Sequence, residues 1–324
     1  MHPSRVVFRL SLRSALVSLL LVTWVSSPAQ ATFPGTNGRI AFTSNLHGTW
    51  QLYTMTPDGS ALRQVTHIPH SRDISLFGSW SPDGTELVFA STMTGDPEIY
   101  TINADGTGLA QITHDPGAAD LIPGFSPDGT KIVFARSAET GNNTIWTMNA
   151  DGSGMRRLTG VFYDSFGPQY APDGRHILFD SSKGGLVAAV WIMKTDGTGK
   201  KRLTAASLEA GFSDVSPDGQ HVLFSNHQNT PRSTSIFVMN IDGSDVTRLT
   251  SAGCCLYDVG AHYSPDGTQI VYATDRQSIP AGCCMELWEM NADGSNQHEV
   301  TSNLTIGGCP EPGNCGPPQW GPKP

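Results

Sequence analysis

The stretch S-P-D-G-T-K-I-V-F-A-R, Ser126–Arg136, recurs along this chain with small variations, and its recurrence decides the fold. Its Pro-Asp-Gly tripeptide occurs five times, starting at residues 82, 127, 172, 217 and 265, at intervals of 45, 45, 45 and 48 residues. A repeat of roughly 40 to 50 residues commonly encodes a unit of four strands. Proline presets φ in a tight turn, aspartate tolerates the next position and glycine takes the positive φ that follows, so each tripeptide ends one strand and begins another.

The residues around each turn have the pattern of short strands. Apolar side chains alternate after the turn, as at Ile132 and Phe134, which predicts strands with one face packed on a neighbouring sheet. A further strand follows, and it ends in an Asp-Gly turn before a short segment of the type Arg-Leu-Thr. Its aromatic centres are Tyr53, Tyr100, Trp146, Trp191, Phe237 and Trp288.

The two halves of the repeat differ in number. The half with the aromatic centre occurs six times and the Pro-Asp-Gly half five times, while the C-terminal sequence P-P-Q-W-G-P-K-P contains a variant of the missing half at Trp320. We therefore predict an all-β, six-bladed β-propeller whose first blade is closed by the C-terminal strand. Closure removes exposed sheet edges. An open solenoid, the alternative, would need capping repeats at both ends.

The repeated pattern S-P-D-G, I-V-F, I-W-T-M-N-A-D-G-S-G and R-L-T resembles the PD40, or WD40-like, repeats of the TolB β-propeller family. Such repeats also occur in the propellers of prolyl-oligopeptidase-like peptidases and of oligogalacturonate lyases. The resemblance implies a TolB-like fold. It does not imply the translocation role of TolB, because we find no counterpart of the α/β domain of TolB between Ala31 and the first blade.

The N-terminal residues 1–31 have the features of a signal peptide. Arg5, Arg9 and Arg13 precede an apolar run from residue 15 to 25, and Ala29-Gln30-Ala31 matches a cleavage site. The run is shorter than the roughly 20 residues that span a bilayer, so we expect no transmembrane segment in the mature chain. We expect the mature propeller to comprise residues 32–324 and to be periplasmic or extracellular.

The charge of the chain excludes one class of partner. The net charge is −9, and removal of the signal peptide with its three arginines would make it −12. A nucleic-acid backbone would be repelled by this balance. We expect a monomer that binds a protein, a peptide or a cell-envelope polymer.

Loops of variable sequence are expected on the face opposite the Asp-Gly turns, and binding commonly resides in such loops. Carboxylates lie near the starts of the predicted innermost strands. An acidic ring at the channel mouth would hold a cation or a basic peptide. The alternative is that these acids only shape the loops. The candidates are Asp73, Asp120, Asp164, Glu209 and Asp258.

An enzyme is the less favoured hypothesis. His67, His70 and His114 fall in loops of the same face, and a metal held by them would fit a metal-dependent polysaccharide lyase or hydrolase, as the resemblance to oligogalacturonate lyase implies. No Gly-x-Ser-x-Gly nucleophile motif occurs, which argues against a peptidase. We expect no catalytic residues and no cofactor, although the acidic ring would allow a bound cation.

The chain has six cysteines, and an even number in an exported chain favours disulfides. Adjacent cysteines seldom pair, because their Cα atoms are about 3.8 Å apart and disulfides need about 4.4 Å or more. We expect Cys254 or Cys255 to pair with Cys283 or Cys284, and Cys309 with Cys315, among 15 possible connectivities. A zinc site is the alternative, although no Cys-x-x-Cys pair is present.

Overall fold

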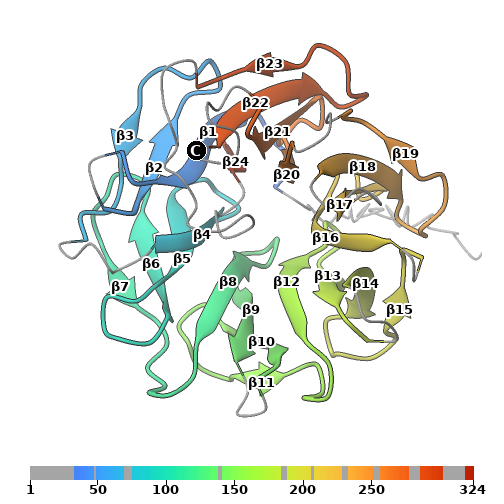
Figure 1. Cartoon of the computed structure of the whole chain (residues 1–324). Coiled ribbons are helices and arrows are strands. Elements are labelled where there is room, and N and C mark those ends of the chain that lie inside the picture. Colours follow the sequence, from blue (N-terminus) through green and yellow to red (C-terminus); the bar gives the residue numbers. More distant parts are fainter. Residues whose placement is uncertain are drawn as a thin grey trace, which may run out of the picture.

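The six-bladed propeller is confirmed by the computed structural model (Figure 1), in which six four-stranded antiparallel sheets are arranged in a ring around a central axis. The structure describes residues 33–46, 49–68, 75–137, 141–183, 188–205, 208–227, 233–251, 256–276, 285–301 and 318–324. The predicted signal peptide and all six cysteines lie outside these residues, so signal cleavage and disulfide pairing stay predictions.

Each sheet, or blade, has an innermost strand at the channel and an outermost strand at the rim, and we number the blades 1 to 6 from the one that contains β1. The innermost strands are β24 (Gln319–Pro322), β4 (Ser75–Trp80), β8 (Asp120–Phe125), β12 (Ser165–Tyr170), β16 (Glu209–Val215) and β20 (Asp258–Tyr263). The second strands are β1 (Asn37–Ser44), β5 (Glu86–Ser91), β9 (Lys131–Ser137), β13 (His176–Ser181), β17 (His221–His227) and β21 (Gln269–Thr274).

The outer half of each blade consists of a longer strand and a very short one. The third strands are β2 (Gln51–Met55), β6 (Glu98–Asn103), β10 (Asn143–Asn149), β14 (Ala189–Lys194), β18 (Thr234–Asn240) and β22 (Glu286–Asn291). The outermost strands are β3 (Arg63–Gln64), β7 (Ala110–Gln111), β11 (Arg156–Arg157), β15 (Lys201–Arg202), β19 (Thr247–Arg248) and β23 (His298–Glu299). Rim strands of two residues leave little unpaired edge, which protects the blades from pairing with other chains.

The ring closes in blade 1, where the two ends of the chain meet. β24 pairs antiparallel with β1, with Ile40 opposite Trp320 and Ala41 opposite Gln319. The C-terminus lies beside these strands in Figure 1. The Lys323 N–H donates a hydrogen bond to the Thr36 carbonyl at 2.9 Å and so extends this pairing beyond the strand. The C-terminal segment therefore supplies the strand that the count of repeats predicts.

The recurring threonine at the end of each repeat has a structural role inside its blade. The Thr66 hydroxyl accepts a hydrogen bond from the Leu52 N–H at 2.8 Å, and both residues are buried. The same bond recurs in the other five blades, where a backbone N–H of the third strand would otherwise lack a partner. These threonines are Thr113, Thr159, Thr204, Thr250 and Thr301.

The recurring aspartates of the Asp-Gly turns are used by the turns themselves. Asp151 accepts hydrogen bonds from the hydroxyl and the N–H of Ser153 at 2.7 and 2.9 Å, and these bonds hold the pKa of Asp151 below its usual value. Asp83 is bound in the same way by Ser81 and Thr85. The turn aspartates are therefore structural, as their place in the repeat indicates.

The core of the molecule is made of the layers between adjacent blades. Apolar residues of the second and third strands, such as Phe89, Phe134 and Phe224, are fully buried there. Among the described residues, no helix is long and apolar enough to cross a bilayer.

Candidate functional site: the central channel

The innermost strands share a distortion that shapes the channel wall. The pairing register shifts within β4, β8, β12, β16 and β20. The shift lies between the third and sixth residues of β16 and between the second and fifth residues of the other four strands. At this bulge the backbone has a positive φ at Ile122, Gly167, Phe212 and Gly260. A left-handed φ is unfavourable for isoleucine and phenylalanine, and such strain persists only where the surroundings enforce it.

One residue from each innermost strand lines the channel at the position before a bulky residue. In blades 2 to 6 it follows the bulge and the bulky residue ends the strand. We call this set the channel ring. Its members are Ser79, Gly124, Gln169, Asp214, His262 and Gln319. Apolar and aromatic residues also line the cavity, among them Phe33, Trp80, Phe125, Tyr170 and Trp320.

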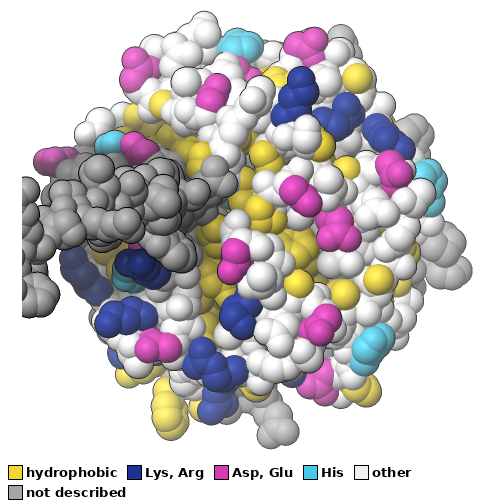
Figure 2. Space-filling view, turned by 180° about the vertical axis from the view of Figure 1, so that it is seen from behind, with side chains coloured by type: hydrophobic (Ala, Val, Ile, Leu, Met, Phe, Trp, Pro, Cys, Tyr) yellow, Lys and Arg dark blue, Asp and Glu magenta, His cyan; other side chains and the backbone are white. Residues whose placement is uncertain are grey.

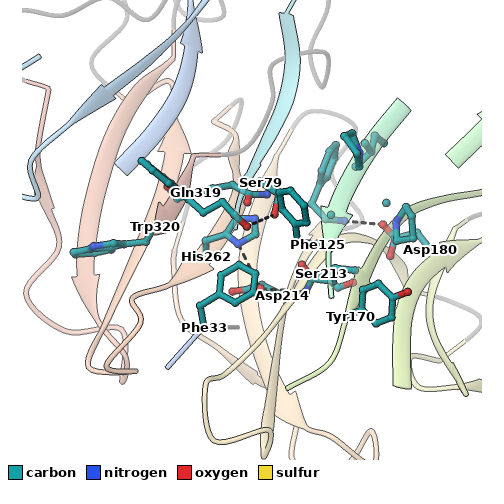
Figure 3. Close-up of a pocket in the computed structure, with 18 of the residues that line it drawn as sticks. Phe33, Ser79, Phe125, Tyr170, Asp180, Ser213, Asp214, His262, Gln319 and Trp320 are labelled. Carbon is teal, nitrogen blue, oxygen red and sulfur yellow. Dashed lines mark hydrogen bonds and ion pairs between the residues drawn. The ribbon is translucent and has the colours of Figure 1, made fainter. Parts of the chain in front are cut away.

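Asp214 is the most highly connected member of the channel ring. Its side chain is 1% exposed and accepts hydrogen bonds from Gln169 Nε2 at 3.1 Å and from the Tyr263 N–H at 2.8 Å. His262 Nδ1 lies 3.4 Å from Asp214 Oδ1, and Figure 3 shows these two side chains pointing toward each other. Three blades thus meet at this carboxylate.

A second carboxyl group lies in the wall behind the ring. Asp180, on β13, is completely buried, and its Oδ2 accepts the Phe212 N–H at 2.9 Å. Burial raises the pKa of Asp180 to about 8, against the opposing effects of the Phe212 N–H and the Ser213 hydroxyl. A Cβ on Gly167 or Gly211 would lie only 3.0 or 3.3 Å from Asp180 Oδ2, so these glycines make room for the carboxyl group.

The channel is narrow at this level. The cavity has a volume of about 90 Å³, which is room for a few water molecules or for one side chain. No Lys or Arg is present among the described residues that line it. Figure 2 shows hydrophobic side chains gathered in the middle of one face, with charged side chains around them.

The five carboxylates predicted to form an acidic ring occupy different environments. Asp120 is buried and forms a two-pronged ion pair with Arg136, with Nε and Nη2 at 2.6 and 2.8 Å from its oxygens. Asp258 is buried beside Arg276 Nη2 at 2.6 Å. Both arginines lie over aromatic rings of their own blades, so these two carboxylates are engaged within blades 3 and 6.

The other three predicted acids differ from these two. Asp164 is half-buried and accepts hydrogen bonds from the N–H and Nδ2 of Asn143. Glu209 is exposed, and Asp73 lies outside the described residues. None of the four described acids lines the cavity at the channel ring.

The predicted histidine site is only partly described. His67 and His114 are exposed, whereas His70 lies outside the described residues. Within the described ranges, no group of three or more His, Cys, Asp or Glu side chains is arranged to hold a metal ion.

Sequence reasoning missed Asp180, Asp214 and His262. The sequence did contain a usable signal for Asp214 and His262, because each stands directly before the bulky residue that ends its innermost strand. Asp180 had no such signal, since it occupies a position on a second strand that is otherwise small or apolar, as at Ala90 and Ala135.

Three solved structures show how widely this architecture is shared. TolB from Acinetobacter baumannii is 26% identical over 88% of this chain and 67% of its own, with a TM-score of 0.71. A candidate TolB from Agrobacterium tumefaciens is 21% identical over 89% of this chain and 99% of its own, with a TM-score of 0.65. An oligogalacturonate lyase from Vibrio parahaemolyticus is 12% identical over 83% of this chain and 77% of its own, with a TM-score of 0.58, which shows the fold alone.

The sequence itself matches one protein family along most of the ring. The matches cover residues 69–232 and 115–304, which together span more than half of the chain. Recurrent Pro-Asp-Gly turns, six closed blades and this match agree with one another, and the chain belongs to the PD40 family, the TolB β-propeller domain.

Proposed function

We propose that this chain is an exported binding module that engages another protein and accepts a cationic group of that partner, an amino group or a guanidinium, at the channel ring. The observation that carries the proposal is the composition of the cavity wall. Two carboxyl groups, Asp180 and Asp214, lie in it, and no Lys or Arg is found among its described residues.

The wall suits a cation that arrives on an apolar segment. Aromatic side chains attract cations through their ring faces, and here Phe33, Trp80 and Tyr170 line the cavity beside the carboxyl groups. The overall charge of −9 favours approach of a positively charged partner over a distance of about 10 Å at moderate salt. At the channel mouth, Glu209 and Asp164 of the predicted acidic ring would add to this field.

A polysaccharide lyase acting on an acidic sugar polymer fits this wall less well. Its substrate would carry one carboxylate on each sugar, and the Asp214 carboxylate in an apolar channel would repel it unless a cation were present. A cavity of about 90 Å³ is also small compared with the roughly 300 Å³ or more of ordinary ligand pockets. Binding of one protein side chain therefore suits the space better than binding of a sugar.

The test compares an open channel with a plugged one. Gly124 has no side chain in the channel ring, its φ is not left-handed, and a Cβ there would make only ordinary contacts at 3.8 and 3.9 Å. The Gly124→Trp variant should therefore fold and fill the ring. In cross-linking pull-downs from the native host, we expect the wild-type chain to recover a partner that Gly124→Trp loses at least tenfold.

Two control variants separate the channel from the remaining surface. Val246→Trp changes an exposed position between an Asp-Gly turn and β19, and Gly160→Trp changes an exposed position in the loop before β12. Both should keep the partner. If Gly124→Trp kept the partner and Gly160→Trp lost it, binding in the channel would be contradicted and binding would be assigned to the loops. Recovery of no partner, with saturable binding and cleavage of oligogalacturonate that depends on added Mn²⁺, would favour the lyase.

Export is tested by itself. Expression of the full chain in a bacterial host, followed by N-terminal sequencing of the protein from the periplasmic fraction, should give a chain that begins at Thr32. A chain that retains Arg5 and stays in the cytoplasm would contradict the signal peptide.

A further inference from the structure

A short segment before the first strand lies outside the six sheets. Residues 33–36 precede β1, and blade 1 is complete without them, because β24 supplies its innermost strand. In blades 2 to 6 the chain reaches the second strand directly from the innermost strand, through a Pro-Asp-Gly turn. The segment is therefore an addition to the repeat, and the repeat does not explain where it lies.

This segment crosses the end of the channel at which the Pro-Asp-Gly turns lie. The Gly35 N–H donates a hydrogen bond to the carbonyl of Pro265, in the turn of blade 6, at 3.1 Å. Two residues earlier, Phe33 packs against the core between blades 1 and 2, which includes Trp80, and the core between blades 2 and 3, which includes Phe125. Blades 3 and 6 lie opposite each other in the ring (Figure 1), so the segment reaches over the central axis.

Phe33 is part of the wall of the channel cavity. It lines the cavity together with the channel ring, and Figure 3 shows its phenyl ring near Asp214 and His262. Phe33 packs beside the last residues of β4 and β8 and so borders the cavity at the Pro-Asp-Gly end, whereas Ile122 and Phe212 line the cavity from within the innermost strands. A side chain that enters from the Pro-Asp-Gly end therefore has to pass Phe33.

Phe33 is held less firmly than the strands of the wall. With the described residues it forms no hydrogen bond, and its contacts are apolar. The hydrogen bonds of the segment begin at Gly35 and continue at Thr36, so an outward turn of Phe33 about residues 34 and 35 would leave the strand pairing intact. Chain ends with few such bonds open at low cost in free energy. If the signal peptide is cleaved as predicted, only Thr32 precedes Phe33.

We propose that Phe33 is a gate, which closes the channel at the Pro-Asp-Gly end and turns outward to admit the cationic group of a partner. The inference rests on the proposed function of the channel ring and adds the route of entry. The partner approaches the face of the Pro-Asp-Gly turns, opposite the face of the variable loops. Opening separates the phenyl ring from its apolar contacts, so the closed gate lowers the apparent affinity for the partner.

The test measures access to a thiol placed in the channel ring. Ser79→Cys gives a member of the ring a thiol of similar size, and the exported protein is labelled with aminoethyl methanethiosulfonate, a small cationic thiol reagent. We expect Phe33→Ala to raise the labelling rate of this thiol about tenfold or more, because no ring has to be moved. Phe33→Leu, which keeps a smaller apolar side chain, should give an intermediate rate. The protein with native Ser79 gives the background from its six cysteines.

Met93→Ala is the matched control for the gate. Like Phe33, Met93 lies outside the strands and packs, partly buried, against the core between blades 1 and 2, but it is not among the residues that line the cavity. Met93→Ala should leave the labelling rate unchanged. Equal rates with and without the Phe33 side chain would overturn the gate. An equal gain in Met93→Ala would also overturn it, because the gain would then come from a general loosening of the core.

A neutral reagent, methyl methanethiosulfonate, separates the gate from the cation site. Phe33→Ala should speed labelling by both reagents, since the gate excludes them by occupying space. With rates corrected for reaction with a free thiol, equal labelling by the two reagents would contradict the cation site and leave the gate standing. A preference for the cationic reagent that Asp214→Asn removes would support the cation site. In the pull-down, Phe33→Ala should recover more of the partner, and loss of the partner would make Phe33 a binding contact and overturn the gate.

Discussion

The indole ring of Trp80 lies directly against the backbone of Gly321, so closely that a Cβ at residue 321 would lie 2.4 Å from Trp80 Cδ2. Trp80 Nε1 also donates a hydrogen bond to the Gln319 carbonyl at 3.2 Å. Trp80 belongs to blade 2 and residues 319 to 321 to the C-terminal strand of blade 1. One tryptophan thus holds the closing strand from the neighbouring blade.

This contact predicts the effect of a single methyl group. Gly321→Ala should lower the free energy of unfolding by about 1–3 kcal/mol, because the ring or the strand must shift to admit the Cβ. Gly160→Ala is the control, since a Cβ there meets no atom within 4 Å. Thermal unfolding measured by circular dichroism would show the loss, and equal midpoints for the two variants would mean that the strand is not held as described.

A second prediction concerns the two aspartates, Asp120 and Asp115, whose carboxylates contact the guanidinium of Arg136. Asp120→Asn should destabilise the protein by about 3–5 kcal/mol, because it leaves a largely buried guanidinium without its charged partner. Asp115 contacts the same guanidinium at 2.8 Å, but its side chain is 51% exposed. Asp115→Asn should therefore cost less than about 1 kcal/mol. Urea unfolding of both variants measures the difference, and similar losses would contradict the assignment of Asp120 as the structural partner.

The buried Asp180 predicts a dependence of stability on pH. Its pKa is about 8 in the folded protein against an ordinary value of 3.8. The folded chain therefore keeps a proton that the unfolded chain loses, so the stability associated with the neutral carboxyl group is complete below pH 3.8 and is lost as pH rises through about 8.

Asparagine at this position carries no charge at any of these pH values. The stability of Asp180→Asn relative to the wild type should rise between pH 4.5 and 8, by at most about 1.4 kcal/mol per pH unit. Calorimetry of both proteins across this range tests the prediction. A difference that stays constant with pH would show that Asp180 is ionised in the folded protein.

The cysteines predict behaviour under reducing conditions. If Cys254 or Cys255 pairs with Cys283 or Cys284, and Cys309 with Cys315, peptide mapping of the exported protein without reductant should recover these linked peptides. Each bond should stabilise the chain by about 2–4 kcal/mol, so reduction should lower the unfolding temperature. Free thiols on the exported protein, or one bound zinc ion per chain, would contradict the disulfides.

The local sequence of this protein determined its architecture. Each Pro-Asp-Gly turn, each alternating strand and each terminal threonine depends on residues within one repeat, so the number of blades and the closing role of Trp320 follow from counting them. Side chains whose partners lie inside the same turn, such as Asp151 and Ser153, are equally predictable.

Only the tertiary structure decided which side chains share the channel and which carboxylates form ion pairs with arginines. Asp214 contacts Gln169 and His262, which lie 45 and 48 residues away along the chain, and sequence spacing does not show that three blades turn these side chains toward one axis. Asp120 looks in the sequence like a free acid at a channel mouth, but pairing of β8 with β9 places Arg136 opposite it. Charge neutralisation depends on distance in space, and the closure of the ring sets those distances.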